Sequence, residues 1–137
     1  MALTFTNTVK AARADTIDSQ IGSAGKLIIY SGTAPSDVSG SVTGNTVLAT
    51  LNWSAAFKST STNGVLTANA PGNATASAGG AGTTATFFRI YKSDGTTAIM
   101  QGSVSDTNGS GDLKLNSASI STGATVSVTS FVITEGN

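Results

Sequence analysis

The chain has 137 residues, seven basic and seven acidic side chains, and no cysteine or histidine. The missing residue types exclude Ser-His-Asp and Cys-His triads, the common zinc sites and disulfides. Zero net charge without a basic stripe argues against nucleic-acid binding, and no apolar run approaches the ~20 residues that span a bilayer.

Only 10% of the residues are charged, against roughly 25% in a typical soluble domain. The surface is therefore expected to consist mainly of hydroxyl, amide and backbone groups, as in many secreted β-proteins, fibre proteins and virion proteins. Low net charge also favours self-association. Residues 1–8 lack the basic and apolar regions of a signal peptide, so we expect synthesis in the cytoplasm without export by the common route.

The N-terminal part is expected to form an arm and a helix. Residues 3–5 can be a short strand or an arm that docks elsewhere, and residues 7–21 form the one convincing helix. Thr6 or Asn7 can cap its start, and glycines follow its end. The helix is expected to bury Val9, Ala12, Ile17 and Ile21 and to leave Lys10, Asp15 and Asp18 in water, with Arg13 inside the apolar arc.

The next segments favour β-strands. Residues 26–30 are rich in β-branched and aromatic side chains, and a turn-rich connection follows over residues 31–46. Residues 47–53 alternate, which predicts that Val47, Ala49, Leu51 and Trp53 share one face. Residues 55–57 are expected to continue this apolar surface after a bend.

A turn at Asn63-Gly64 precedes a predicted strand at residues 65–69. Residues 70–82 contain no large side chain and are expected to form a mobile loop or a poorly specified edge strand. Residues 84–103 predict a hairpin that turns at residues 93–96. Because aromatic side chains occupy both faces of its first strand, this strand is expected to be central and covered on both sides.

The C-terminal part predicts a loop at residues 106–112, a short strand at Leu113 and Leu115, and a long strand at residues 125–135. Seven to nine strands and one helix indicate a mainly β fold, an antiparallel β-sandwich of jelly-roll or Greek-key type. We expect one domain over residues 1–137, with the arm and helix in residues 1–24 and the sandwich in residues 25–137.

One loop has the spacing of a calcium site. Asp106, Asn108, Ser110 and Asp112 alternate as oxygen ligands do, but the closing glutamate is missing and no helices flank the loop. These residue types are also the ones that ordinary turns prefer, and we favour that interpretation. We expect no catalytic residue and no cofactor, because the carboxylates, including Asp94, lie mostly in turn contexts.

Two further groups of side chains leave alternatives open. Tyr30, Trp53, Phe57, Phe88 and Tyr91 could form a sugar-binding platform, although their alternation within strands favours a core role. Arg13 and Arg89 lie among apolar residues. Each can pair with a carboxylate, with Asp15, Asp94 and Glu135 as candidates, or reach a partner chain.

Segments along nearly the whole chain resemble a family of small virion proteins of tailed bacteriophages. The resemblance is carried by LTFTN (3–7), KAARAD (10–15), GKL and IYSGT (within 25–33), GVLTAN (64–69), FR (88–89), SDGT (93–96), DLKLNS (112–117) and VSVTSF (126–131). Within that family the chain looks most like a jelly-roll capsid decoration, or cement, protein.

The resemblance implies a structural protein on the capsid exterior that binds the major capsid protein and forms a homodimer or another homo-oligomer. It implies no small-molecule substrate, nucleic acid or membrane. Leu3, Phe5, Arg13 and Arg89 are the expected partner contacts, together with residues 70–82. The second hypothesis is a tail or head-fibre module that binds a host glycan, which exposed aromatic side chains would favour. A small hydrolase ranks third.

Overall fold

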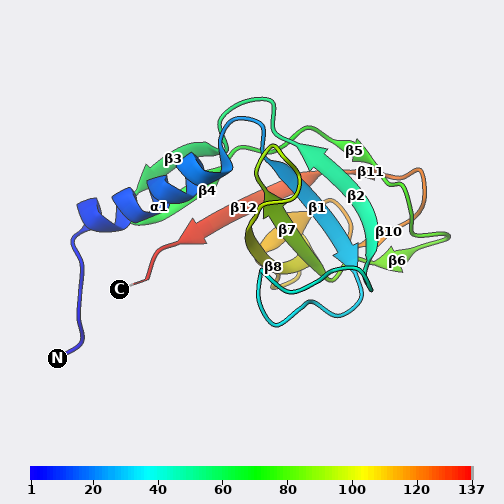
Figure 1. Cartoon of the computed structure of the whole chain (residues 1–137), viewed down its shortest axis with the longest axis horizontal. Helices are drawn as coiled ribbons and strands as arrows, with labels where there is room; N and C mark the ends of the chain where they lie inside the picture. The colour runs from blue at the N-terminus through cyan, green and yellow to red at the C-terminus, as the bar shows by residue number, and fades with distance from the viewer. Residues whose placement is uncertain (137) are drawn as a thin grey trace.

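The computed structural model describes residues 1–136 and has a mainly β architecture with one N-terminal helix, as predicted (Figure 1). An eight-stranded curled sheet forms the body, consistent with a β-sandwich. The helix, α1, is Asn7–Ile21. The strands are β1 (Lys26–Ser31), β2 (Thr46–Asn52), β3 (Lys58–Thr62), β4 (Val65–Ala68), β5 (Ala74–Thr75), β6 (Thr83–Thr84), β7 (Phe87–Tyr91), β8 (Ala98–Asp106), β9 (Leu113–Leu115), β10 (Ser119–Ile120), β11 (Thr125–Val126) and β12 (Val128–Thr134).

The order of the large sheet is β2-β1-β7-β8-β9-β12-β4-β3. All of its pairs are antiparallel except β8 with β9, which makes the sheet mixed. A short loop is enough to connect these two parallel strands, because β9 pairs with only the last three residues of β8. Two further pairs, β5 with β11 and β6 with β10, give residues 70–84 more order than a simple loop.

The hairpin of β7 and β8 provides the centre of the fold, as expected. Every residue of β7 is buried. One face points into the main core, where Phe88 contacts Phe131 of β12 edge-on at a centroid distance of 5.3 Å. On the other face Phe87 stacks on Tyr30 at 4.9 Å. The connection between β1 and β2 lies over this second face and accepts hydrogen bonds there at Asp37 and Pro35.

The predicted alternation of β2 is wrong at its start. Val47 is 39% exposed, whereas Leu48 and Ala49 are both buried. The register between β1 and β2 shifts at Ile29/Tyr30, so that one residue of β2 has no partner. A bulge of this kind reverses the side chains beyond it, and sequence periodicity does not contain it.

The helix has the predicted bounds but a different buried face. Thr6 caps it by accepting a hydrogen bond from the Val9 N–H at 3.4 Å. The buried positions are Ala14 and Ile21, with Ile17 partly buried, whereas Val9 is 42% exposed. The helix packs on β3 and β4, and β3 was not predicted. The sequence therefore did not indicate which side of the helix contacts the sheet, and that contact determines the buried face.

Candidate interaction surface

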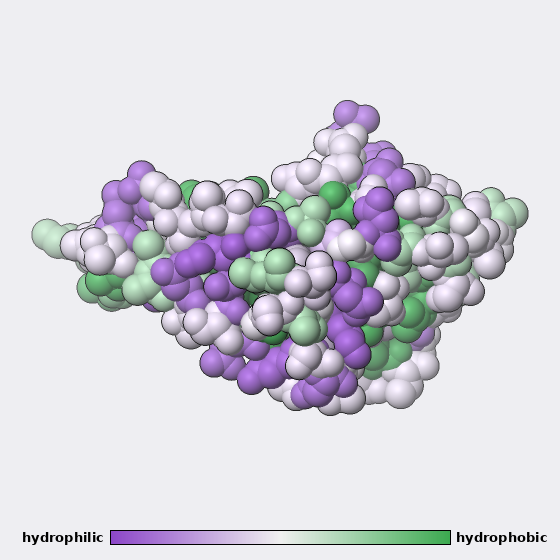
Figure 2. Space-filling view, turned by 90° about the horizontal axis from the view of Figure 1, so that it is seen from above, coloured by the Kyte–Doolittle hydropathy of each residue, from purple (hydrophilic) through white to green (hydrophobic). Residues whose placement is uncertain are grey.

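The two most exposed large apolar residues, Met1 and Leu3, belong to the N-terminal arm, residues 1–6. Leu3 is 74% exposed and Phe5 is 36% exposed. The arm leads away from the body and carries the N-terminus at its tip (Figure 1). Figure 2 shows hydrophobic surface at this tapered end and also on the opposite half of the same face, with hydrophilic side chains between them. Large apolar side chains exposed on a projecting segment make the arm the candidate surface for binding another protein.

Arg13 connects the arm to the end of the sheet. Its guanidinium lies 5.3 Å from the centre of the Phe5 ring, and its Nη2 lies 3.2 Å from Glu135 Oε2. The predicted pairing of Arg13 with a carboxylate is confirmed, with Glu135 as the partner. Both contacts are near the surface, where a cation–π pair contributes about 0.5–1 kcal/mol and an ion pair about 0–1 kcal/mol. The arm is therefore held weakly and can be released.

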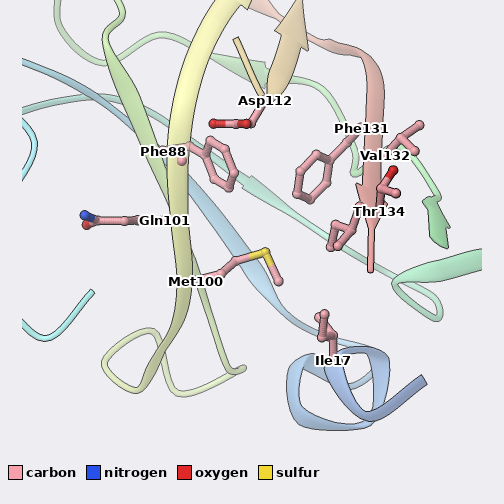
Figure 3. Close-up of a pocket in the computed structure, with 10 residues that line it drawn as sticks. Ile17, Phe88, Met100, Gln101, Asp112, Phe131, Val132 and Thr134 are labelled. Atoms are coloured by element: carbon pink, nitrogen blue, oxygen red, sulfur yellow. The ribbon is translucent and has the colours of Figure 1, made fainter. Parts of the chain in front are cut away.

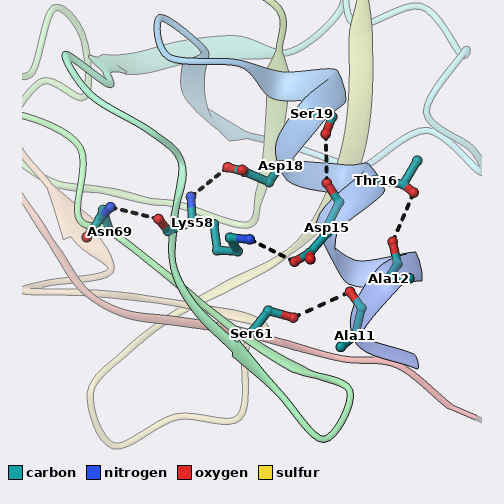
Figure 4. A network of polar contacts seen from close by, with 9 residues as sticks. All are labelled: Ala11, Ala12, Asp15, Thr16, Asp18, Ser19, Lys58, Ser61 and Asn69. Atoms are coloured by element: carbon teal, nitrogen blue, oxygen red, sulfur yellow. Dashed lines mark hydrogen bonds and ion pairs between the residues drawn. The ribbon is translucent and has the colours of Figure 1, made fainter. Parts of the chain in front are cut away.

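Three polar contacts fix the helix that carries the arm (Figure 4). The backbone N–H of Lys58 donates to Asp18 Oδ1 at 2.8 Å, and its ammonium donates to Asp15 Oδ1 at 2.9 Å. Ser61 Oγ donates to the Ala11 carbonyl at 3.5 Å. The hydrogen bond from Lys58 lowers the pKa of Asp15. The expectation that Asp15 and Asp18 only face water is wrong, because both dock α1 on β3.

A cleft of about 400 Å³ lies between β8 and β12 (Figure 3). Phe88, Met100, Phe131 and Ile133 supply apolar side chains to it. Figure 3 places Asp112 at one end and Ile17 of α1 at the other, which we call the mouth. The cleft is therefore an elongated groove with apolar side chains in its interior and polar groups along its borders, and it lies between two strands near the helix.

Asp112 closes the far end of the cleft. Its Oδ2 accepts hydrogen bonds from the Ser103 hydroxyl at 2.7 Å and from the Ser103 backbone N–H at 2.8 Å. These hydrogen bonds stabilise the carboxylate and lower its pKa. Asp112 thus binds the backbone of β8 at the position where β9 begins.

The rest of the predicted calcium loop is engaged in turn contacts. Asp106 Oδ1 accepts from the backbone N–H groups of Asn108 and Gly109, both at 3.0 Å. The Lys114 ammonium donates to the Gly109 carbonyl and, at 3.1 Å, to Ser105. Within residues 1–136, no three Asp, Glu, His or Cys side chains gather as a metal site requires. The calcium loop stays a prediction, and the turn interpretation accounts for these contacts.

Arg89 is buried, with only 4% of its surface exposed. Its Nε donates to Gln101 at 2.9 Å and its Nη2 to the Asp37 carbonyl at 3.1 Å. The expected carboxylate partner is wrong, because these neutral oxygens take its place. Arg89 also borders a second pocket of about 460 Å³ beneath residues 38–43. It joins the sheet to that connection and is not a surface contact like Leu3 and Phe5.

The aromatic side chains weighed as a sugar platform are all buried. Tyr30, Trp53 and Tyr91 are between 3% and 6% exposed. Tyr30 and Tyr91 join through their hydroxyls at 2.9 Å, and Trp53 donates to the Asn69 carbonyl at 2.7 Å. Their burial counts against the glycan hypothesis, which required such rings on the surface.

The carboxylates weighed for hydrolysis are spread over the fold. Asp94 accepts hydrogen bonds from Thr96 and Thr97 within its own turn, and these lower its pKa. It precedes β8, whereas Asp106 ends that nine-residue strand, which at ~3.3 Å per residue separates them by more than about 25 Å.

No helix within residues 1–136 is long and apolar enough to cross a membrane.

Sequence reasoning identified the arm but missed the cleft. The apolar residues of the cleft come from four separate elements, α1, β7, β8 and β12. One feature of the sequence could have indicated the cleft: the apolar segment Leu113–Leu115 is much shorter than the long predicted strands before and after it.

Comparison of the chain with protein-family models, with curated proteins and with solved structures found no match. The function is therefore argued from the residues and surfaces of this chain.

Proposed function

We propose that this chain is a structural protein of a tailed-phage virion that decorates the capsid, binding the major capsid protein and a second copy of itself. The observation that carries the proposal is the arm, which presents Leu3 and Phe5 to solvent at one end of the molecule. The surface is poor in charge and the net charge is zero, which lowers electrostatic repulsion between crowded copies. The resemblance to small virion proteins supplies the partner.

Burial of the arm provides enough free energy for a specific contact. Full burial of a leucine or phenylalanine side chain contributes roughly 1.5–3 kcal/mol. Because Leu3 is 74% and Phe5 only 36% exposed in the free chain, burial of the remaining surface of both would contribute roughly 2–3 kcal/mol, which corresponds to about one to two powers of ten in the dissociation constant. Repetition of this contact over a capsid would add avidity.

The test mixes purified protein with expanded phage heads that lack it and measures bound protein by sedimentation and gel densitometry. We expect saturation at a fixed ratio to the major capsid protein. The variant Leu3→Ser/Phe5→Ser should bind at least ~10-fold more weakly.

The control is Val47→Ser/Val65→Ser, which removes two apolar side chains of the strands that are 39% and 38% exposed, close to Phe5 at 36% and below Leu3 at 74%. This control should bind heads like the original protein. Absence of binding to heads, or equal loss in both double variants, would contradict capsid decoration through the arm.

A further inference from the structure

The cleft is a place in the sheet where one strand is too short. β9 has three residues and lies between β8, with nine, and β12, with seven. It pairs with Val104–Asp106 of β8 and with residues 128–131 of β12. Beyond β9, residues 98–103 of β8 and 132–134 of β12 have no strand between them, and the cleft occupies this position (Figure 3).

Backbone hydrogen-bonding groups line both sides of the cleft. The Ser103 N–H points to Asp112, away from β7, so strand alternation directs the N–H and C=O of Gln101 the same way. On β12 the Glu135 N–H donates to the Gly64 carbonyl at 2.7 Å, on the β4 side. Alternation then directs the backbone groups of Val132 and Thr134 toward the cleft. Facing unpaired edges are a template for an added strand.

The interior of the cleft selects the kind of strand. The side chains that lie inside, including Phe88, Met100 and Phe131, are apolar, whereas Val132 and Thr134 are exposed on the outer side. A strand that fits must carry large apolar side chains at alternate positions and small or polar ones between them.

The arm has this pattern. Leu3 and Phe5 alternate with Ala2, Thr4 and Thr6, and residues 2–6 in extended form span about 16 Å. Residues 98–102, the part of the β8 edge that Asp112 does not occupy, are also five residues and span about 16 Å. An apolar face of two large side chains and a hydroxyl-bearing outer face therefore match the cleft in length and chemistry.

The arm cannot fill the cleft of its own chain. It leaves the helix at Thr6, eleven residues and about 16 Å along the axis from Ile17 at the mouth. Leu3 is three residues from Thr6, a reach of about 10 Å when extended. Neither Leu3 nor Phe5 can therefore pass the mouth, and the donor must be another molecule.

We propose that the arm of a second copy enters the cleft as an added strand in line with β9, with Leu3 and Phe5 against Phe88 and Phe131. The arm would leave Arg13, pair with the free edges of β8 and β12, and complete the sheet. This inference deepens the self-association part of the proposed function. Its test uses the purified protein alone: association without heads would assign the arm to a second copy, whereas a monomeric protein whose head binding depends on Leu3 and Phe5 would assign it to the capsid and overturn this inference.

The test is sedimentation velocity of the full chain over a range of concentrations. Two variants remove one half of the contact each. Leu3→Ser/Phe5→Ser removes the apolar face of the arm, and Thr134→Pro removes a backbone donor at the cleft edge while sparing the β4 ladder. Thr134→Val keeps the N–H and is the matched control. Circular dichroism verifies that each variant is folded.

We expect the original protein and Thr134→Val to associate, and each of the two defective variants to associate about 10-fold more weakly. A mixture of the two defective variants should regain a complex, because one supplies an intact arm and the other an intact cleft. A purely structural role for either segment would not produce this rescue. A monomeric original protein at its highest soluble concentration, or association without rescue in the mixture, would overturn the proposal.

Discussion

Replacement of Phe57 tests whether the aromatic contacts of the core hold the two halves of the sheet together. Phe57 is fully buried in the bend between β2 and β3. Its ring meets Trp53 edge-on at a centroid distance of 5.1 Å and Phe131 at 6.0 Å. Phe131 in turn contacts Phe88, so one chain of rings joins β12, β7 and the bend. The substitution Phe57→Ala removes the centre of this chain.

The expected loss is about 3–5 kcal/mol, the usual range for truncation of a buried phenylalanine. Each edge-on contact accounts for about 0.5–1.5 kcal/mol of that value, and lost transfer energy and the remaining cavity account for the rest. A domain of this size has a free energy of unfolding of roughly 5–15 kcal/mol, so the variant should be folded but much less stable. Its Tm should fall by roughly 10–20 °C.

The assay is thermal and urea unfolding followed by circular dichroism, at one low protein concentration because self-association would add apparent stability. Phe5→Ala is the matched control, since it makes the same chemical change at a side chain that is 36% exposed. The control should lose less than about 1 kcal/mol. Equal losses in the two variants would refute the assignment of Phe57 to the core and of Phe5 to the surface.

Two further predictions concern the cleft. A Cβ at Gly102 would lie 2.8 Å from the Phe88 ring, so Gly102→Ala should lower the free energy of unfolding in urea by about 1–3 kcal/mol. The control is Gly44→Ala, because a Cβ at Gly44 meets nothing within 4 Å, and it should change stability by less than about 0.5 kcal/mol. A tolerated Gly102→Ala would show that the cleft floor is looser than described. Because the folded pKa of Asp112 is lowered, its stabilising contribution is present above the unfolded pKa of ~3.9 and is lost as the pH falls through the folded pKa. Asp112→Asn should therefore reduce the acid sensitivity of unfolding below about pH 4, and an unchanged pH profile would exclude this role.

The elements with strong local signals could be predicted from the sequence. The helix has the predicted bounds because a capping threonine and two following glycines mark its ends. The hairpin of β7 and β8 was predicted because Asp94-Gly95 favours a tight turn, and aromatic side chains on both faces indicated a central strand. These features depend on neighbours within a few residues.

Features that depend on distant partners could not be predicted. The bulge between β1 and β2 exchanges the faces of Val47 and Leu48, although both are apolar and fit either side. Asp18 faces β3 because Lys58, forty residues away, offers a backbone donor there. Arg89 pairs with neutral oxygens of residues brought together by the sheet and the connection over it.

The arm and the cleft, the two halves of the proposed contact, differ in the same way: the arm follows from a local pattern and the cleft from distant contacts. The sequence by itself determined the donor, because the alternation of Leu3 and Phe5 with small and polar residues is a local pattern. Only the tertiary structure decided the acceptor. The cleft exists because β9 begins only opposite Val104 and leaves the earlier part of β8 and the end of β12 without a strand between them, and strand order and register come from contacts between residues far apart in the chain.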